Sequence, residues 1–370
     1  MSFKPVSVAV IGCGNISGIY FTNCKRMESL KVTACADLDR SRAAARAKEF
    51  GIPRVLTVDQ VMADPEIELI LNLTVPKAHY SVAKRAVMAG KSVYNEKPLT
   101  LTPAEGRTLL KLAAKKRVLV GGAPDTFLGA GHQACRAIID SGEIGTPVAA
   151  TAFMMCHGHE SWHPSPEFHY EVGGGPMLDM GPYYVTALVN MLGPVRRVTG
   201  SARISFPKRT ITSEPKHGKV IKVATPTHLA AVLDFRSGAI ATLVTSFDVW
   251  AHTHSCIEIY GSEGSLRVPD PNGFGGDVLI KKPGDQEWKL VEYSRPYAEN
   301  SRGVGVADLA CSIRRRSRKH RASGTLTFHV LEVMSAVHAA SKAGRHKLIT
   351  STCNLPAPVP EDVPFGQLDA

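Results

Sequence analysis

The sequence contains no long apolar run and no closely paired cysteines. No stretch approaches the roughly 18 to 20 apolar residues of a transmembrane helix, so we expect no membrane span and no membrane partner. The apolar residues 6–11 are too few for the core of a signal peptide. The eight cysteines are scattered without a CxxC pair, which is typical of reduced thiols. These absences predict a cytoplasmic protein without disulfide bonds.

Compositional bias is also absent. Apolar residues make up 44% and charged residues 21%, with 32 glycines and 24 prolines, which excludes the disordered and fibrous classes. The chain has 370 residues, enough for two domains that each bury a substantial core.

The formal net charge is +11, and much of the excess is local. Six basic residues fall within one short run: Arg314, Arg315, Arg316, Arg318, Lys319 and Arg321. A nucleic-acid surface is one interpretation of this run, but no basic-aromatic interleaving and no nucleic-acid module accompany it. We therefore interpret the run as a solvated helix end and expect no nucleic-acid partner.

The first third of the chain alternates β-branched apolar runs with helical patterns. This alternation predicts a doubly wound parallel sheet, an α/β Rossmann domain over residues 1–124. We expect strands at 6–11, 31–36, 69–73, 92–94 and 118–121, helices at 16–27, 40–50, 78–89 and 104–115, and a weaker strand-helix pair at 54–62.

The rest of the chain, residues 125–370, predicts an α+β domain with an open, mainly antiparallel sheet. We expect strands at 147–155 and within 228–250, helices at 132–141, 177–192 and 326–343, and an extended proline-containing tail at 355–365. An open sheet needs a cover, so a homodimer or homotetramer is expected.

A glycine loop follows the first expected strand and precedes a helix, which is the context of a dinucleotide-binding motif. In Gly12-Cys13-Gly14-Asn15-Ile16-Ser17, Gly12 would allow the tight turn and Gly14 the approach of a pyrophosphate. Ser17 stands where a third glycine is usual. The alternative is a strand-to-helix turn without a ligand.

Asp37 ends the second expected strand, where a carboxylate can accept hydrogen bonds from the adenosine ribose. Because a carboxylate would repel a 2′-phosphate, this position favours NAD, although Arg40 could still accommodate NADP. The alternative role for Asp37 is the N-cap of the next helix.

Two polar loops follow later strands of the same sheet. Thr74-Val75-Pro76 with His79 follows one strand, and Asn95-Glu96-Lys97-Pro98 follows the next. Ligands of doubly wound sheets bind beyond the carboxyl ends of the strands. We therefore expect Lys97 near the reactive carbon, where its charge could stabilise an alkoxide.

These motifs resemble the Gfo/Idh/MocA family of glucose-fructose oxidoreductases and inositol dehydrogenases. The resemblance rests on the glycine loop, the two polar loops, Gly142 to Gly145, and Gly173-Gly-Gly175 with Leu178-Asp179-Met180-Gly181. It implies that Lys97 contacts substrate and nicotinamide, that Glu96 contacts the ribose and that Pro98 is cis. It also implies a second domain that oligomerises through its sheet. The cofactor-binding candidates are Gly12, Gly14, Asn15, Ile16, Asp37, Thr74, Pro76, His79, Glu96 and Lys97.

The resemblance assigns a catalytic pair to Asp179 and the residue four positions later. That residue is Tyr183, where the family usually has histidine, and the sequence is similar in this respect to the glucose-fructose oxidoreductase branch. A phenol near an ammonium can serve as a base. One continuous helix would place both residues on one side. The alternative is a packed structural tyrosine, a role that we expect for Tyr184.

Histidines are dense between residues 156 and 169. Cys156, His157, His159, His163 and His169 invite a zinc interpretation, but the spacing matches no zinc finger, and we expect no metal. We instead expect a substrate wall formed by Trp162 and His163. Asp125 is a further candidate for substrate hydroxyls, and His252 and His254 are expected on the surface.

The sequence thus predicts an NAD-dependent sugar or polyol dehydrogenase. Lys97 and Tyr183 would take the hydroxyl proton while Asp179 orients the group, and the hydride would pass to the nicotinamide. Oxidation of an aldose at carbon 1 to a lactone is favoured over oxidation of an inositol. The alternatives are a sugar reductase, a redox glycosidase that uses NAD transiently, and a non-catalytic NAD or sugar sensor.

Overall fold

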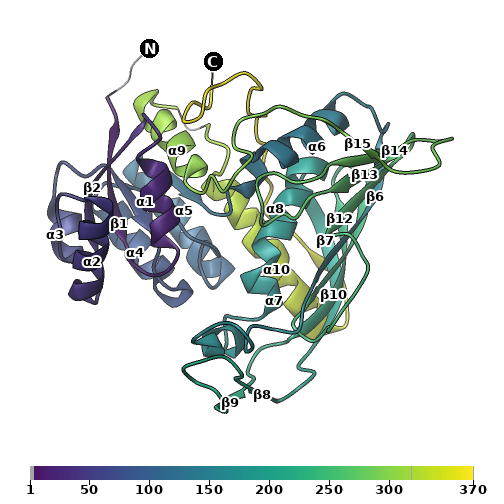
Figure 1. The fold of residues 1–370 in the computed structure, drawn as a ribbon, viewed down its shortest axis with the longest axis horizontal. Coiled ribbons are helices and arrows are strands. Elements are labelled where there is room, and N and C mark those ends of the chain that lie inside the picture. Colours follow the sequence, from purple (N-terminus) through teal and green to yellow (C-terminus); the bar gives the residue numbers. More distant parts are fainter. Residues whose placement is uncertain (1–3, 318, 370) are drawn as a thin grey trace. The chain divides into compact units, whose positions relative to one another are not determined.

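The computed structural model describes residues 4–317 and 319–369, which form two compact units (Figure 1). The first unit is drawn from Met1–Gln133, Ser294–Leu331 and Pro356–Ala370, and the second from Ala134–Tyr293 and Glu332–Leu355. The expected boundary after residue 124 therefore takes no account of two later segments that return to the first unit. Within the described ranges, no helix has the length and apolar character needed to cross a membrane.

The first unit contains the expected parallel sheet, with strand order β2-β1-β3-β4-β5. Its strands are β1 (Val6–Ile11), β2 (Leu30–Ala36), β3 (Leu69–Asn72), β4 (Ser92–Asn95) and β5 (Val120–Gly122). The chain steps from β1 to β2 on one side and then to β3 on the other. The carboxyl ends of β1 and β3 therefore mark the switch point at which such sheets bind ligands.

The first unit contains the helices α1 (Ser17–Cys24), α2 (Arg40–Phe50), α3 (Val58–Ala63), α4 (Pro76–Met88), α5 (Pro103–Lys116), the short 3-10 helix Thr126–Leu128, and α9 (Val304–Arg314). Three helices of this unit, α2, α3 and α5, begin at side-chain caps. Asp39 caps α2, and capping boxes start α3 at Thr57 and α5 at Thr102. The strand expected within 54–62 is reduced to one bridge at Val55, because the Thr57 capping box starts a helix there.

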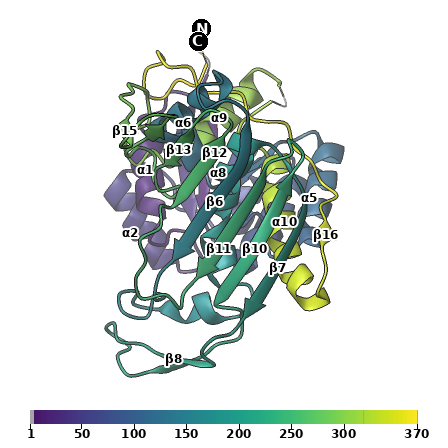
Figure 2. The same cartoon turned by 90° about the vertical axis from the view of Figure 1, so that its right-hand side faces the viewer.

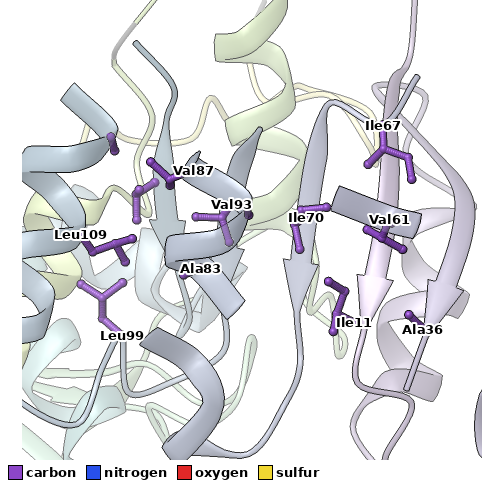
Figure 3. Close-up of a cluster of buried hydrophobic side chains, with 14 of the residues drawn as sticks. Ile11, Ala36, Val61, Ile67, Ile70, Ala83, Val87, Val93, Leu99 and Leu109 are labelled. Atoms are coloured by element: carbon purple, nitrogen blue, oxygen red, sulfur yellow. The ribbon is translucent and has the colours of Figure 1, made fainter. Parts of the chain in front are cut away.

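Apolar side chains from the sheet and its covering helices form the core of the first unit. Figure 3 shows Ile11, Ile70 and Val93 on the strands, with Ala83 and Leu109 on the helices packed against them. All five are at most 2% exposed. This burial holds the carboxyl ends of the strands in fixed positions.

The second unit is built on a nine-stranded sheet of order β15-β14-β13-β12-β6-β11-β10-β7-β16 (Figure 2). The expected open, mainly antiparallel sheet is confirmed, with β6 and β11 as its parallel pair. The strands are β6 (Pro147–Met155), β7 (Val195–Arg203), β10 (His228–Phe235), β11 (Ile240–Ser246), β12 (Ile257–Gly261), β13 (Ser265–Val268), β14 (Leu279–Lys281), β15 (Lys289–Leu290) and β16 (Lys347–Leu348). A separate hairpin pairs β8 (Lys208–Thr210) with β9 (Val220–Lys222).

One face of the large sheet is buried and the other carries exposed apolar side chains. Burial alternates along β10 and β11, and α8 contacts β6. Val232 and Ile240 remain exposed on the other face. The second unit also contains the 3-10 segment Pro166–Tyr170 and parts of α6 (Ala130–Asp140) and α10 (Gly324–Ala343).

The helix expected over 177–192 is two helices, α7 (Pro176–Asp179) and α8 (Gly181–Leu192). Pro182 has no N–H to donate to the preceding turn, so the hydrogen-bond ladder is interrupted and a new helix starts. Asp179 is consequently the last residue of α7, whereas Tyr183 lies in the first turn of α8. The expectation of one shared helix face was wrong.

The basic run is only in part a solvated helix end: Arg316 and Lys319 are exposed, but three arginines of the run form ion pairs within the chain. Arg314 pairs with Glu68 at 2.6 Å, and Arg315 pairs with Asp369. Arg321 is buried and bonds Asp308 and Asp369 at 2.6 and 2.7 Å. Arg318 lies outside the described residues. The arginines thus hold the C-terminal segment to the first unit.

Arg321→Ala should lower the free energy of unfolding by about 3–5 kcal/mol, because it leaves the buried Asp308 carboxylate without its cation. Chemical denaturation would measure the loss. Lys319→Ala, an exposed lysine of the same run, is the matched control and should change stability by less than about 0.5 kcal/mol. Equal effects of the two substitutions would contradict the structural role of the Arg321 network.

Candidate active site

The glycine loop after β1 has the geometry expected of a dinucleotide site. Gly12 has a φ of 101°, and a Cβ there would lie 2.6 Å from the carbonyl carbon of Leu73, so only glycine fits. At Gly14 a Cβ would meet nothing within 4 Å, which leaves the backbone open to a phosphate. Ser17 is buried and its hydroxyl donates to the Gly14 carbonyl at 2.7 Å. Serine at the usual third-glycine position therefore braces the loop.

Asp37 joins the glycine loop to the end of β2. Its Oδ2 accepts a hydrogen bond from the Cys13 amide at 2.8 Å, and its Oδ1 accepts one from the Asp39 amide at 2.9 Å. Asp39, and not Asp37, caps α2, which removes the N-cap alternative. The nearby cation is Arg42, at 3.6 Å, rather than Arg40. This arrangement fits a carboxylate poised at the ribose end of a dinucleotide.

Buried amides connect the two polar loops after β3 and β4. The Asn72 amide donates to Asn95 Oδ1 at 2.9 Å, and Asn95 donates to the Leu99 carbonyl at 2.9 Å. Thr74 donates its hydroxyl to Asn72 Oδ1 at 2.7 Å, and Pro76 opens α4. The loops are thus held as one polar layer along the carboxyl edge of the sheet.

His79 lies between these two loops, and its expected cofactor contact stays a prediction. The ring is 1% exposed, and its Nδ1 and Nε2 lie 2.7 Å from the Pro98 carbonyl and 2.9 Å from the Thr74 carbonyl. Burial lowers the pKa of His79. The two ring nitrogens thus face carbonyls of both loops, and the ring positions the turn between them.

Lys97 stands on a turn whose backbone is fixed on both sides. The Lys97–Pro98 bond is cis, as the resemblance implied. The Lys97 amide donates to Glu96 Oε2 at 2.8 Å, and Tyr20 donates its hydroxyl to Glu96 Oε1 at 2.9 Å. Glu96 is therefore occupied from both sides, and its ribose contact stays a prediction. Tyr20, which the sequence gave no reason to select, is the buried residue that orients it.

Asp125 is buried in the first unit instead of facing solvent. It is 1% exposed, and its Oδ2 accepts hydrogen bonds from the Gly303 and Gly305 amides at 2.9 and 3.0 Å, at the start of α9. Burial raises its pKa to about 6 despite these bonds. These bonds give Asp125 a role at a helix N-terminus, and its contact with substrate hydroxyls stays a prediction.

In the second unit, Asp179 is met by two histidines from other elements. Its Oδ2 lies 3.2 Å from Nε2 of His159 and 3.3 Å from Nδ1 of His169. The glycine triplet permits this approach, because a Cβ at Gly174 would lie 2.5 Å from the Phe168 carbonyl oxygen. Gly175 donates its amide to the His169 carbonyl at 2.7 Å. Sequence spacing alone could not reveal this cluster.

Aromatic side chains surround the cluster. Trp162 is 63% exposed, with its ring 5.2 Å from the ring of His159, and the ring of His163 lies 5.4 Å from that of Trp162. Trp250 is 82% exposed and stacks on His157 at 3.3 Å, a contact that the sequence did not indicate. These exposed indole faces suit the apolar face of a sugar ring.

The other expected residues of this unit divide into buried and exposed ones. Tyr183 and Tyr184 are 7% and 4% exposed. Burial, with Cys256 nearby, raises the pKa of Tyr184, in keeping with its expected structural role. His252 and His254 are exposed, as expected. The catalytic role of Tyr183 stays a prediction.

Two family descriptions match the chain. An oxidoreductase family with an NAD-binding Rossmann fold, GFO_IDH_MocA, matches residues 6–122, and the GFO/IDH/MocA C-terminal domain matches residues 132–267. The first unit is therefore an NAD-binding Rossmann domain. The glycine loop and Asp37, described above, fit that cofactor.

Named relatives cover most of the chain. A 1,5-anhydro-D-fructose reductase of Ensifer adhaerens is 27% identical over 280 residues, 74% of this chain and 77% of that protein. An inositol 2-dehydrogenase of Burkholderia cenocepacia is 26% identical over 286 residues, 73% of this chain and 76% of that protein. Levoglucosan dehydrogenase in complex with NADH and levoglucosan has the same fold, with a TM-score of 0.82, 17% identity, and coverage of 94% and 100% of the two chains.

Asp125→Asn should change how stability depends on pH. The folded pKa of about 6 exceeds the usual value of 3.8, so the unfolded chain ionises first as pH rises. The wild type therefore loses stability between about pH 4 and 6, by an amount on the order of 2–3 kcal/mol. Asparagine still accepts the two amides but cannot ionise.

Unfolding titrations of both proteins between pH 4 and 7 would test this expectation. The free energy of unfolding of the variant minus that of the wild type should increase as pH rises through this range. A difference between the two proteins that does not vary with pH would contradict the raised pKa of Asp125.

Proposed function

Because the chain belongs to the Gfo/Idh/MocA family of NAD(P)-dependent oxidoreductases, we propose that it interconverts a hydroxyl and a carbonyl on a cyclic sugar or polyol. The observation that carries this proposal is the fixed turn of Lys97 after β4, in the same Rossmann sheet as the open glycine loop after β1. A cofactor bound at the carboxyl edge of this sheet would have an ammonium available for the reacting oxygen.

The proposed reacting carbon is a ring carbon that bears a secondary hydroxyl. The named relatives support this choice, because an inositol has no anomeric carbon and a 1,5-anhydro sugar has no free hydroxyl on carbon 1. Oxidation of an aldose at carbon 1 to a lactone stays the second candidate. It is favoured by Tyr183, which stands where the sugar-oxidising branch that the sequence resembles also has tyrosine.

In the proposed reaction, the hydroxyl proton would pass to a protein base, and the carbon that bears the hydroxyl would give up its hydrogen as hydride. Bound NAD supplies the hydride acceptor. Lys97 stabilises the developing negative charge on oxygen, Tyr183 accepts the proton, and Asp179 orients the reacting hydroxyl. The exposed face of Trp162 would support the sugar ring, with His163 as a hydrogen-bonding neighbour.

NADH absorbance measured with NAD, a panel of inositols, anhydro sugars, aldoses and glycosides, and the reverse reaction with ketones would test this proposal. Lys97→Ala and Tyr183→Phe should each lower kcat/KM for the best substrate by about 10²–10⁴-fold. Lys111→Ala, an exposed lysine on α5, is the matched control and should leave kcat/KM unchanged.

Other results would assign the chain to another class. Cleavage of a glycoside without net NADH would indicate a redox glycosidase. Binding of NAD or sugar without turnover in either direction would indicate a sensor. Full activity of both variants would contradict the roles given to Lys97 and Tyr183.

A further inference from the structure

We propose that His159, His169 and Asp179 form a binding site for one divalent transition-metal ion of the Zn²⁺ type. The three side chains come from separate elements of the second unit: the loop after β6, the 3-10 segment Pro166–Tyr170, and the end of α7. One ligand atom from each lies within 4.8 Å of the other two. The proposal goes beyond the proposed reaction and does not depend on it.

The ligand types and their spacing fit such an ion. Imidazole nitrogen and carboxylate oxygen are common ligands of Zn²⁺, with metal-ligand distances of about 2.0–2.1 Å. In a tetrahedral site at those distances, neighbouring ligand atoms lie about 3.3 Å apart. The two nitrogen-to-Oδ2 separations here are 3.2 and 3.3 Å.

The protein holds the two imidazoles before any ion arrives. His159 and His169 are 8% and 6% exposed, and their ring centroids lie 3.9 Å apart. Phe247 meets the His159 ring edge-on at 4.6 Å, and Phe168 lies 4.0 Å from the His169 ring. The hydrogen bond that the Gly175 amide donates to the His169 carbonyl fixes the backbone. A site that is already ordered loses little entropy on binding.

The acidic residue next to His159 is committed elsewhere. Glu160 pairs with Arg209 at 2.7 Å through Oε1, and Tyr170 donates its hydroxyl to Oε2. The proposed site therefore has three protein ligands, the number typical of zinc sites that keep a position for water or substrate oxygen. From the sequence we expected no metal, because neither the Cys/His spacing nor a partner elsewhere matches a zinc finger and hydride transfer to NAD needs no metal. In the structure Asp179 joins the two histidines from a later helix.

Titration of the purified, chelator-treated full-length chain with Co²⁺ would test the site. We expect visible absorption bands of low-symmetry Co²⁺ that saturate at one ion per chain and are displaced by Zn²⁺. His169→Phe retains an aromatic ring beside Phe168 and removes one ligand. It should weaken Co²⁺ binding by at least about 10-fold, as should Asp179→Asn.

His217→Gln replaces an exposed histidine of the same unit and is the matched control, with unchanged Co²⁺ binding expected. Zn²⁺ should also raise the unfolding midpoint of the wild type and of this control, but not that of His169→Phe, which separates ligand loss from misfolding.

Absence of stoichiometric Co²⁺ uptake by the wild type would overturn the proposal and leave a hydrogen-bonded His-Asp-His cluster. Equal uptake by wild type and His169→Phe would overturn it as well. Since no NAD or sugar is present in these titrations, the result does not depend on whether the proposed reaction is correct.

Discussion

The close backbone contact between Gly12 and the Leu73–Thr74 peptide is the constraint on which the first unit depends. It holds the glycine loop after β1 against the end of β3, at the point where the strand order reverses. From there a continuous polar layer extends to the Lys97 turn through Asn72, Asn95 and His79. The carboxyl edge of one sheet therefore positions both the glycine loop and Lys97.

The second unit depends on a comparable backbone contact. Gly174 and Gly175 bring the Phe168–His169 segment against the start of α7, and this approach places His169 beside Asp179. The glycine triplet, Gly173 to Gly175, has no Cβ atoms to keep another backbone segment at a distance. In the structure it admits another part of the same unit, and Asp179 gains two imidazole neighbours even though the fourth position after it holds Tyr183.

Local sequence patterns predicted most of the first unit. The spacing of apolar residues indicates its strands and helices, and capping residues mark where several of the helices begin. The sequence could not predict features that depend on contacts between distant segments. Asp125 is buried where it accepts hydrogen bonds from Gly303 and Gly305. Arg321 is buried where it bonds Asp308 and the C-terminal segment. The α7–α8 break could have been predicted, since Pro182 cannot continue a hydrogen-bond ladder.

Calorimetric titration of the purified chain with NAD and NADP tests the central claim most directly, because the proposed reaction requires a dinucleotide at the β1–β3 switch point. The account predicts binding of NAD, weaker binding of NADP beside the Asp37 carboxylate, and loss of NAD binding in Gly12→Ala, where the new Cβ would displace the loop. Failure of the wild type to bind either dinucleotide, or unchanged binding in Gly12→Ala, would contradict it.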